Sequence, residues 1–167
     1  GLISEDYITS QVVDHSDKIY EGFSKLLVDE EFINQFYLGE ALIVDKEMTE
    51  EQNLKLYPNQ FLMLVSSSNE KKTALARFTS HKLPITHIVD LKNELLWGVL
   101  PRNKEQSFAF DLLFDDDIPL VSLIGKAGSG KTLMAIAAGL EQALGKKDAK
   151  YGRIVISRPV QPMGKDI

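Results

Sequence analysis

The chain reads Gly125-Lys126-Ala127-Gly128-Ser129-Gly130-Lys131-Thr132 between two apolar runs. These residues fit the pattern G-x-x-x-x-G-K-[ST] at every position. The run 119–124 in front of them predicts a buried strand, and the Ala- and Leu-rich run Lys131–Leu144 behind them predicts a helix. A strand, a glycine-rich loop and a helix in this order are typical of a P-loop. The competing interpretation, a glycine-rich turn without a ligand, is disfavoured by the complete match.

Each residue type in this loop suits the binding of an anion. Glycines let successive backbone N–H groups converge on a phosphate, and the following helix points its positive end at the same place. Lys131 can reach the β- and γ-phosphates as a compact charge and is the expected catalytic residue. Thr132 can offer its hydroxyl to Mg²⁺. We therefore expect ATP and Mg²⁺ as cofactors, held by Gly125, Lys126, Ala127, Gly128, Ser129, Gly130, Lys131 and Thr132.

Helical and strand patterns alternate around the loop. The run Glu105–Phe114 has a helical stripe, and Arg153–Ser157 is a second strand candidate. This alternation predicts an α/β domain built on a parallel sheet. Asp115–Asp117 is expected to be a solvated loop, because acids oppose the negative end of the preceding helix. After Thr132 no apolar strand ends in Asp or Glu, as ATP hydrolysis would require, so we expect these residues alone to have little or no ATPase activity.

The residues before position 97 follow a different pattern. Short strands are expected at 22–28, Phe61–Val65, Thr73–Phe78 and Ile85–Val89, and a short helix is expected to begin after Asp29. Several short strands separated by turn signals predict a small, mostly β module. The predicted organisation is a linker with a short helix at 1–38, a β-rich connector module at 39–96, and a partial P-loop domain at 97–167.

Composition limits the class of protein. Of the 167 residues, 44% are hydrophobic and 26% are charged, as in an ordinary globular domain, which excludes a disordered tail. No apolar run is long enough to cross a membrane, and without cysteine the chain suits a reducing cytoplasm. The net charge of -5 combines an acidic region, 1–70, with a basic region, 71–167. The basic region suggests contact with phosphate, and the alternative is an uneven scatter of charge without a function.

From residue 97 onward the sequence resembles the PhoH family of P-loop ATPases. Beside the loop itself, the resemblance is carried by Pro101-Arg102-Asn103, Glu105-Gln106, Asp117–Val121, Ser157–Val160 and Pro162–Ile167. More loosely, Leu56–Phe61 is similar to the connector of longer members that carry an N-terminal PIN nuclease domain. Ser129 departs mildly from the threonine that is common there. The resemblance implies a fragment that lacks the PIN domain and the C-terminal part of the ATPase domain.

The resemblance also implies a core like the first RecA-like domain of superfamily 1 helicases, and it suggests two further site residues. Gln106 lies where such helicases place a glutamine that contacts adenine, and its amide can donate and accept at once. The alternative is a helix-capping arrangement with Asn103. Arg158 lies where related helicases contact the nucleic-acid backbone, and its alternative is a solvated loop position.

The leading functional hypothesis is a cytoplasmic ATPase whose full-length form couples ATP hydrolysis to the remodelling or unwinding of RNA. Two alternatives stay open at this point. One is a nucleotide-responsive binding module without turnover, and the other is a P-loop kinase, for which Lys131 and Thr132 would serve equally well. The expected partners are ATP and RNA, with no membrane. An oligomeric parent protein, and association of this fragment through an open sheet edge, are also expected.

Overall fold

The computed structural model describes residues 22–89, 91, 97–144 and 149–157. Its elements in chain order are β1 (Phe23–Val28), α2 (Glu30–Tyr37), α3 (Lys46–Glu50), β2 (Gln60–Ser66), β3 (Thr73–Phe78), β4 (Thr86–His87), α4 (Lys104–Leu113) and α5 (Lys131–Leu144). The strands expected before residue 90 and the helices expected after positions 29, 104 and 130 are therefore confirmed. Within the described residues, no helix is both long and apolar enough to span a membrane.

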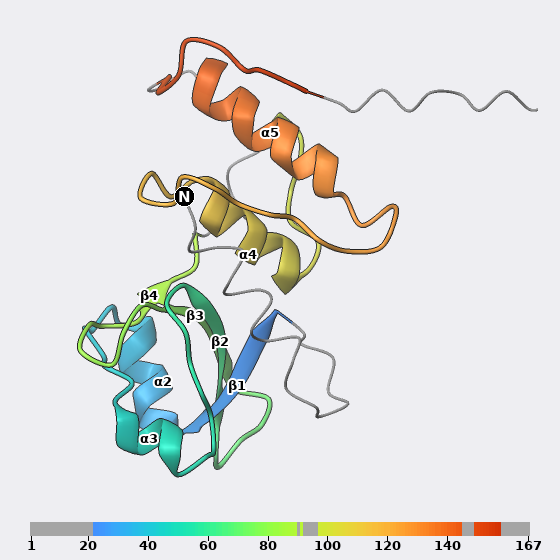
Figure 1. Cartoon of the computed structure of the whole chain (residues 1–167). Coiled ribbons are helices and arrows are strands. Elements are labelled where there is room, and N and C mark those ends of the chain that lie inside the picture. The colour runs from blue at the N-terminus through green and yellow to red at the C-terminus, as the bar shows by residue number, and fades with distance from the viewer. Residues whose placement is uncertain (1–21, 90, 92–96, 145–148, 158–167) are drawn as a thin grey trace, which may run out of the picture.

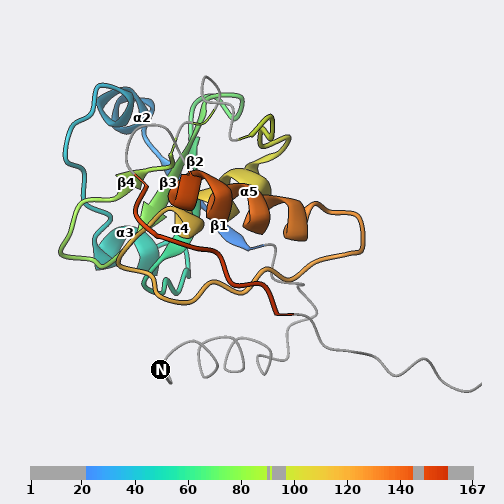
Figure 2. The ribbon, with the colours of Figure 1, turned by 90° about the horizontal axis from the view of Figure 1, so that it is seen from above.

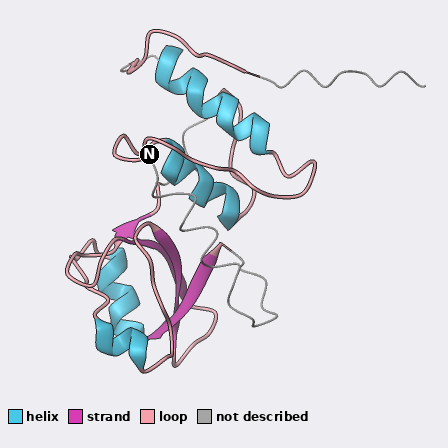
Figure 3. Cartoon of the chain, in the orientation of Figure 1, coloured by secondary structure: helices cyan, strands magenta, loops and turns pink. Residues whose placement is uncertain are grey.

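The strands form one four-stranded sheet in the order β1-β2-β3-β4. Strand β1 runs parallel to β2, with α2 and α3 as the crossover, and the other two pairs are antiparallel. Helices α2 and α3 lie on one side of the sheet, α4 lies on another side, and α5 lies beyond α4 (Figure 1). Figure 2 shows α5 stacked over α4 from above, and Figure 3 shows that every strand belongs to the lower body of Figure 1.

Alternation along the strands gives the sheet two apolar faces. Leu62 and Leu64 of β2 are fully buried against the α2 side, together with Ile33 and Phe36 of α2. The preceding residue, Phe61, faces the opposite way, into a cluster with residues of β1 and α4. Successive strand residues point to opposite faces, so a strand whose two faces are both covered has a continuous apolar sequence, as β2 does.

Helix α3 lies within the range 39–96, for which the sequence predicts a β-rich module. The Asp45 carboxylate Oδ1 accepts a hydrogen bond from the Met48 backbone N–H at 2.9 Å, which caps the helix. The stretches 41–44 and 54–56 on either side form no strand. The expected boundary after residue 38 falls between α2 and α3, inside the crossover that joins β1 to β2. As domain boundaries, positions 38/39 and 96/97 stay predictions.

The two strands expected around the P-loop are not formed. Residues 119–124 and 153–157 have no strand assignment, and the expected parallel sheet around α5 is absent from the described part of the chain. Leu120 and Ile124 are 63% and 82% exposed, whereas a buried strand had been predicted. A strand needs neighbours for its backbone groups and its side chains, and no described strand pairs with either segment.

Candidate phosphate-binding site

The predicted P-loop turns directly into α5. Gly128 and Gly130 adopt φ values of +78° and +88°, a region that residues with a Cβ avoid. A Cβ added to Gly130 would also lie 3.3 Å from the side-chain nitrogen of Gln106, and one added to Gly125 would lie 3.3 Å from Ser129 Oγ. Glycine at these positions therefore permits both the turn and the close approach of neighbouring groups.

Lys131, the first residue of α5, folds its ammonium group back onto the loop. Its Nζ donates to the carbonyl oxygens of Gly125 and Lys126 at 2.8 and 2.7 Å, and approaches Ser129 Oγ at 3.3 Å. Two neutral carbonyls are weaker partners for an ammonium group than an anionic oxygen. The Lys131 ammonium group is therefore held beside the loop by neutral partners.

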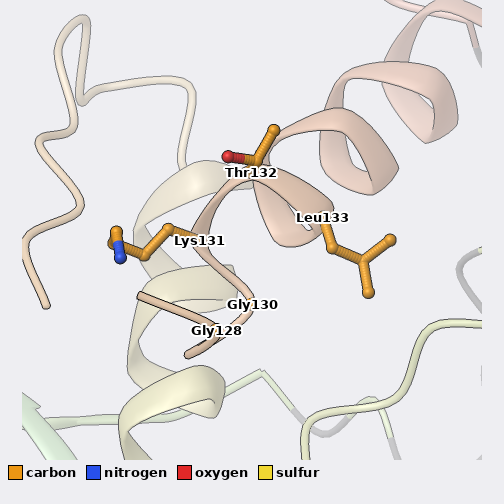
Figure 4. A pocket seen from close by; sticks show the side chains of 5 residues that line it. All are labelled: Gly128, Gly130, Lys131, Thr132 and Leu133. Atoms are coloured by element: carbon orange, nitrogen blue, oxygen red, sulfur yellow. The ribbon is translucent and has the colours of Figure 1, made fainter. Parts of the chain in front are cut away.

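An open pocket of about 260 Å³ lies at the start of α5 (Figure 4). It is lined by Gly128, Gly130, Lys131, Thr132 and Leu133. Figure 4 shows the Lys131, Thr132 and Leu133 side chains pointing in different directions from the first turn. The pocket lies at the end of α5 where backbone N–H groups are unpaired and the helix dipole is positive, so its chemistry suits an anion.

Gln106 is brought next to the loop from the first turn of α4. Its Nε2 donates to the Ser129 carbonyl at 3.2 Å, and its Oε1 accepts from the Arg102 backbone N–H at 2.7 Å. The Gln106 backbone N–H donates to Asn103 Oδ1 at 2.9 Å. The side chain thus belongs to the helix-cap network and also touches the P-loop. A contact to adenine stays a prediction.

The structure brings most of the predicted site residues together. The loop residues 125–132 and Gln106 meet at the N-terminal ends of α4 and α5, with Lys126, Ala127 and Thr132 exposed. Arg158 lies outside the described residues, so its predicted contact to nucleic acid has no structural description here.

Sequence reasoning missed Leu133 and Gln142. Leu133 lines the pocket, but no pattern distinguishes it from other apolar residues of α5. Gln142 Nε2 on the last turns of α5 donates to the carbonyl oxygen of Leu113 at 3.0 Å, which ties the far end of α5 to α4. The pair Glu141-Gln142 interrupts the mostly apolar run 133–144, and this was the available signal for such a contact.

The sequence is similar to those of known proteins. Residues 98–167 match the family described as PhoH-like protein. The chain is 36% identical over its whole length to the protein PhoH2 of Bacillus subtilis, and 29% identical over 164 residues to the protein PhoH2 of Thermobispora bispora. It spans 36% and 34% of the length of these two curated relatives.

A shorter similarity, 41% identity over 69 residues, relates 41% of this chain to 15% of the protein PhoH2 of Mycolicibacterium smegmatis. No solved structure matches the chain. The family match includes the P-loop, and it implies a P-loop NTPase-like fold for that segment, with which a mixed sheet flanked by helices is compatible. Together with the similarity along its whole length, this match shows that the chain belongs to the PhoH family.

Proposed function

We propose that the chain binds ATP·Mg²⁺ through residues 125–132, and that the whole protein couples ATP hydrolysis to the remodelling or unwinding of RNA. PhoH membership suggests an ATP-binding P-loop protein. The observation that carries the proposal is the junction at Lys131, where the ammonium group, the positive end of α5 and the open pocket coincide.

The residues of this junction fit a magnesium-bound triphosphate. Lys131 would leave its two carbonyl partners for the β- and γ-phosphates, because a charge-assisted bond to an anion is stronger. Thr132 would hold Mg²⁺ through its exposed hydroxyl. When bound, Mg²⁺ neutralises phosphate charge. The positive φ at Gly128 and Gly130 leaves the loop backbone free to approach the phosphate closely.

A titration with ATP·Mg²⁺ tests the proposal directly. Lys131→Ala removes the amine at the loop and should abolish measurable nucleotide binding. Lys82→Ala removes an exposed lysine remote from the P-loop in sequence and should bind as the wild type does. Tight, magnesium-dependent binding by Lys131→Ala would refute the P-loop assignment.

Turnover separates the ATPase from its two alternatives. A nucleotide-responsive binding module would bind ATP without hydrolysis in any length of the chain, and a kinase would consume ATP only with an acceptor substrate. We propose the ATPase, with little turnover from these 167 residues and substantial turnover from the whole protein. ATP hydrolysis by this chain that Lys131→Ala eliminates would contradict the expectation of little turnover from these 167 residues.

The RNA part of the proposal predicts a dependence on salt. Residues 71–167 are basic overall, and contacts to phosphate weaken as salt rises because counterions are released. Arg158→Ala should weaken RNA binding at every salt concentration and reduce the slope of that dependence by about one unit. No binding by the wild type even at low salt would remove the nucleic-acid contact. A cysteine-free chain also fits the cytoplasmic location that we propose.

A further inference from the structure

Helix α4 crosses the sheet along a single row of side chains. The sheet register places Phe23 of β1 opposite Phe61 of β2, and Phe61 opposite Arg77 of β3. These three residues, called here the docking row, point to the face that α4 covers. The α4 residues that contact the row are Lys104, Phe108 and Asp111, and Asp115, in the loop that follows α4, contacts it as well.

The spacing of the helix residues matches the spacing of the strands. Lys104, Phe108 and Asp111 follow one another at intervals of four and three, so they form one face of α4. From Lys104 to Asp111 a helix rises about 10.5 Å, and two strand spacings cover about 9.6 Å. One helix face can therefore contact β1 with its first turn and β3 with its last.

The first two contacts of the docking row are aromatic. The Lys104 ammonium lies 4.3 Å from the centroid of the Phe23 ring. The Phe108 ring stacks on Phe61 with centroids 4.3 Å apart and lies 6.1 Å from Phe23. Phe108 is 4% exposed, so this contact removes a large apolar side chain from water.

The third contact of the row is a buried ion cluster. Arg77 NH1 lies 3.2 Å from Asp111 Oδ2, and Arg77 NH2 is hydrogen bonded to Asp115. Asp111 is 5% exposed, and its Oδ1 accepts from the Val89 backbone N–H at 2.9 Å. Breaking a buried pair leaves an uncompensated charge and is costly, so this cluster fixes the position of α4 along the row.

The opposite face of α4 packs against α5. Phe110 is fully buried in a cluster with Met134, Ala137 and Ala138 of α5. The two ends of α4 are also bonded to the α5 region. Near its start, Gln106 donates to Ser129 of the loop, and at its end the Leu113 carbonyl accepts from Gln142.

We infer that Arg77 and Asp111 are positioning residues for the P-loop, acting through α4. The inference rests on the proposed binding of nucleotide at residues 125–132. Phosphate binding requires Lys131 to leave the carbonyls of Gly125 and Lys126, and the loop must present a fixed backbone while it does so. Helix α4 holds that backbone at Ser129 through Gln106, and Arg77 of β3 fixes the position of α4. A displacement of about 1 Å at such a site is enough to weaken binding or catalysis strongly.

The test measures ATP·Mg²⁺ affinity and hydrogen exchange in the full chain. Arg77→Met should weaken ATP·Mg²⁺ binding by at least about fivefold, the lower end of ordinary coupling between sites. It should also speed exchange of the loop amides 125–132 in nucleotide-free protein. The matched control is Lys72→Met, which removes the ion pair to Glu30 on α2 and should change neither quantity. Asp115→Asn removes only the half-buried partner of Arg77 and should weaken binding less.

A double-mutant cycle separates positioning from general destabilisation. If Arg77 acts through α4, Arg77→Met should cost less affinity in a Gln106→Ala background than in the wild type. Additive effects, or unchanged loop exchange and affinity in Arg77→Met, would overturn the inference. If Arg77→Met fails to fold, Asp115→Asn with unchanged loop exchange would overturn it equally. If the wild type binds no nucleotide, the proposed function fails, and the loop exchange in nucleotide-free protein still decides whether Arg77 positions the loop.

Discussion

Phe61 of β2 and Phe108 of α4 stack face to face, with their ring centroids 4.3 Å apart and their planes inclined by 11°. Both rings are almost completely buried, at 5% and 4% exposure. This pair joins the sheet of residues 23–87 to the helix that precedes the P-loop. The β-rich part of the chain and the part that carries the P-loop therefore share one packed interface.

Replacing Phe108 by alanine should destabilise the protein by about 3–5 kcal/mol, the usual cost of removing a buried phenylalanine. Urea unfolding measures this loss. Leu144→Ala is the control, because this leucine on α5 is 62% exposed and its truncation should change stability by less than about 0.5 kcal/mol. Equal, small effects of both substitutions would mean that α4 does not pack on the sheet in solution.

Two substitutions separate the proposed adenine contact of Gln106 from its part in the helix cap. Asn103→Ala removes the side chain that accepts from the Gln106 backbone N–H and should cost about 1 kcal/mol of stability without changing the preference for ATP over GTP. Gln106→Ala should abolish that preference. Competition between ATP and GTP measures it, and full retention of adenine preference by Gln106→Ala would exclude the contact.

The stability of the protein should depend on pH through Asp111. Burial raises the pKa of this carboxyl, while the Val89 N–H and the Arg77 guanidinium lower it in part. The stability that protonated Asp111 contributes is fully present below its unfolded pKa, which lies near 3.8, and is lost as pH rises through its higher folded pKa. The pKa of Asp115 is lowered: its burial acts to raise it, and the Asp117 N–H and Arg77 outweigh that effect.

Asp111→Asn isolates this contribution, because asparagine does not titrate and Asp115 remains in both proteins. The unfolding free energy of the variant relative to the wild type should therefore rise as the pH increases above about 4. Urea unfolding at several pH values measures the difference. A difference that stays constant, or that falls with rising pH, would contradict the raised pKa.

Gln52 should protect the outer edge of the sheet. Its side-chain amide accepts from the Leu27 N–H and donates to the Leu27 carbonyl, each at 2.8 Å, as a neighbouring strand would. An edge strand with free backbone groups invites pairing with another chain. Gln52→Ala should therefore promote concentration-dependent association, measured by sedimentation. Glu51→Ala, at the exposed neighbouring position, should not change the association of the chain.

The elements that could be predicted from the sequence are those with a local signal. The acids before Phe32 and the apolar spacing to Phe36 predict α2, and the alternation in Thr73–Phe78 predicts β3. The P-loop pattern predicts both the glycines at positive φ and the start of α5 at Lys131. Helix α3 was missed although Asp45 supplies a capping side chain three residues before Met48.

Features that depend on distant partners could not be predicted. The run 119–124 has the composition of a strand, but no described strand pairs with it. Asp115 was expected to be solvated, yet it is 19% exposed and bound to Arg77, 38 residues earlier. The local sequence around Arg77 or Asp115 does not predict their contact, because that contact is set by the register of three strands.

The docking row also implies that β1, β2 and β3 pair before α4 docks. Its three members come from strands β1, β2 and β3, so no complete surface for α4 exists until these strands have paired. All three precede α4 in the chain. During synthesis the three strands therefore emerge before α4, and α4 emerges before the P-loop. Slowing the pairing of β1 with β2 should therefore delay the docking of α4 and, with it, the formation of the P-loop.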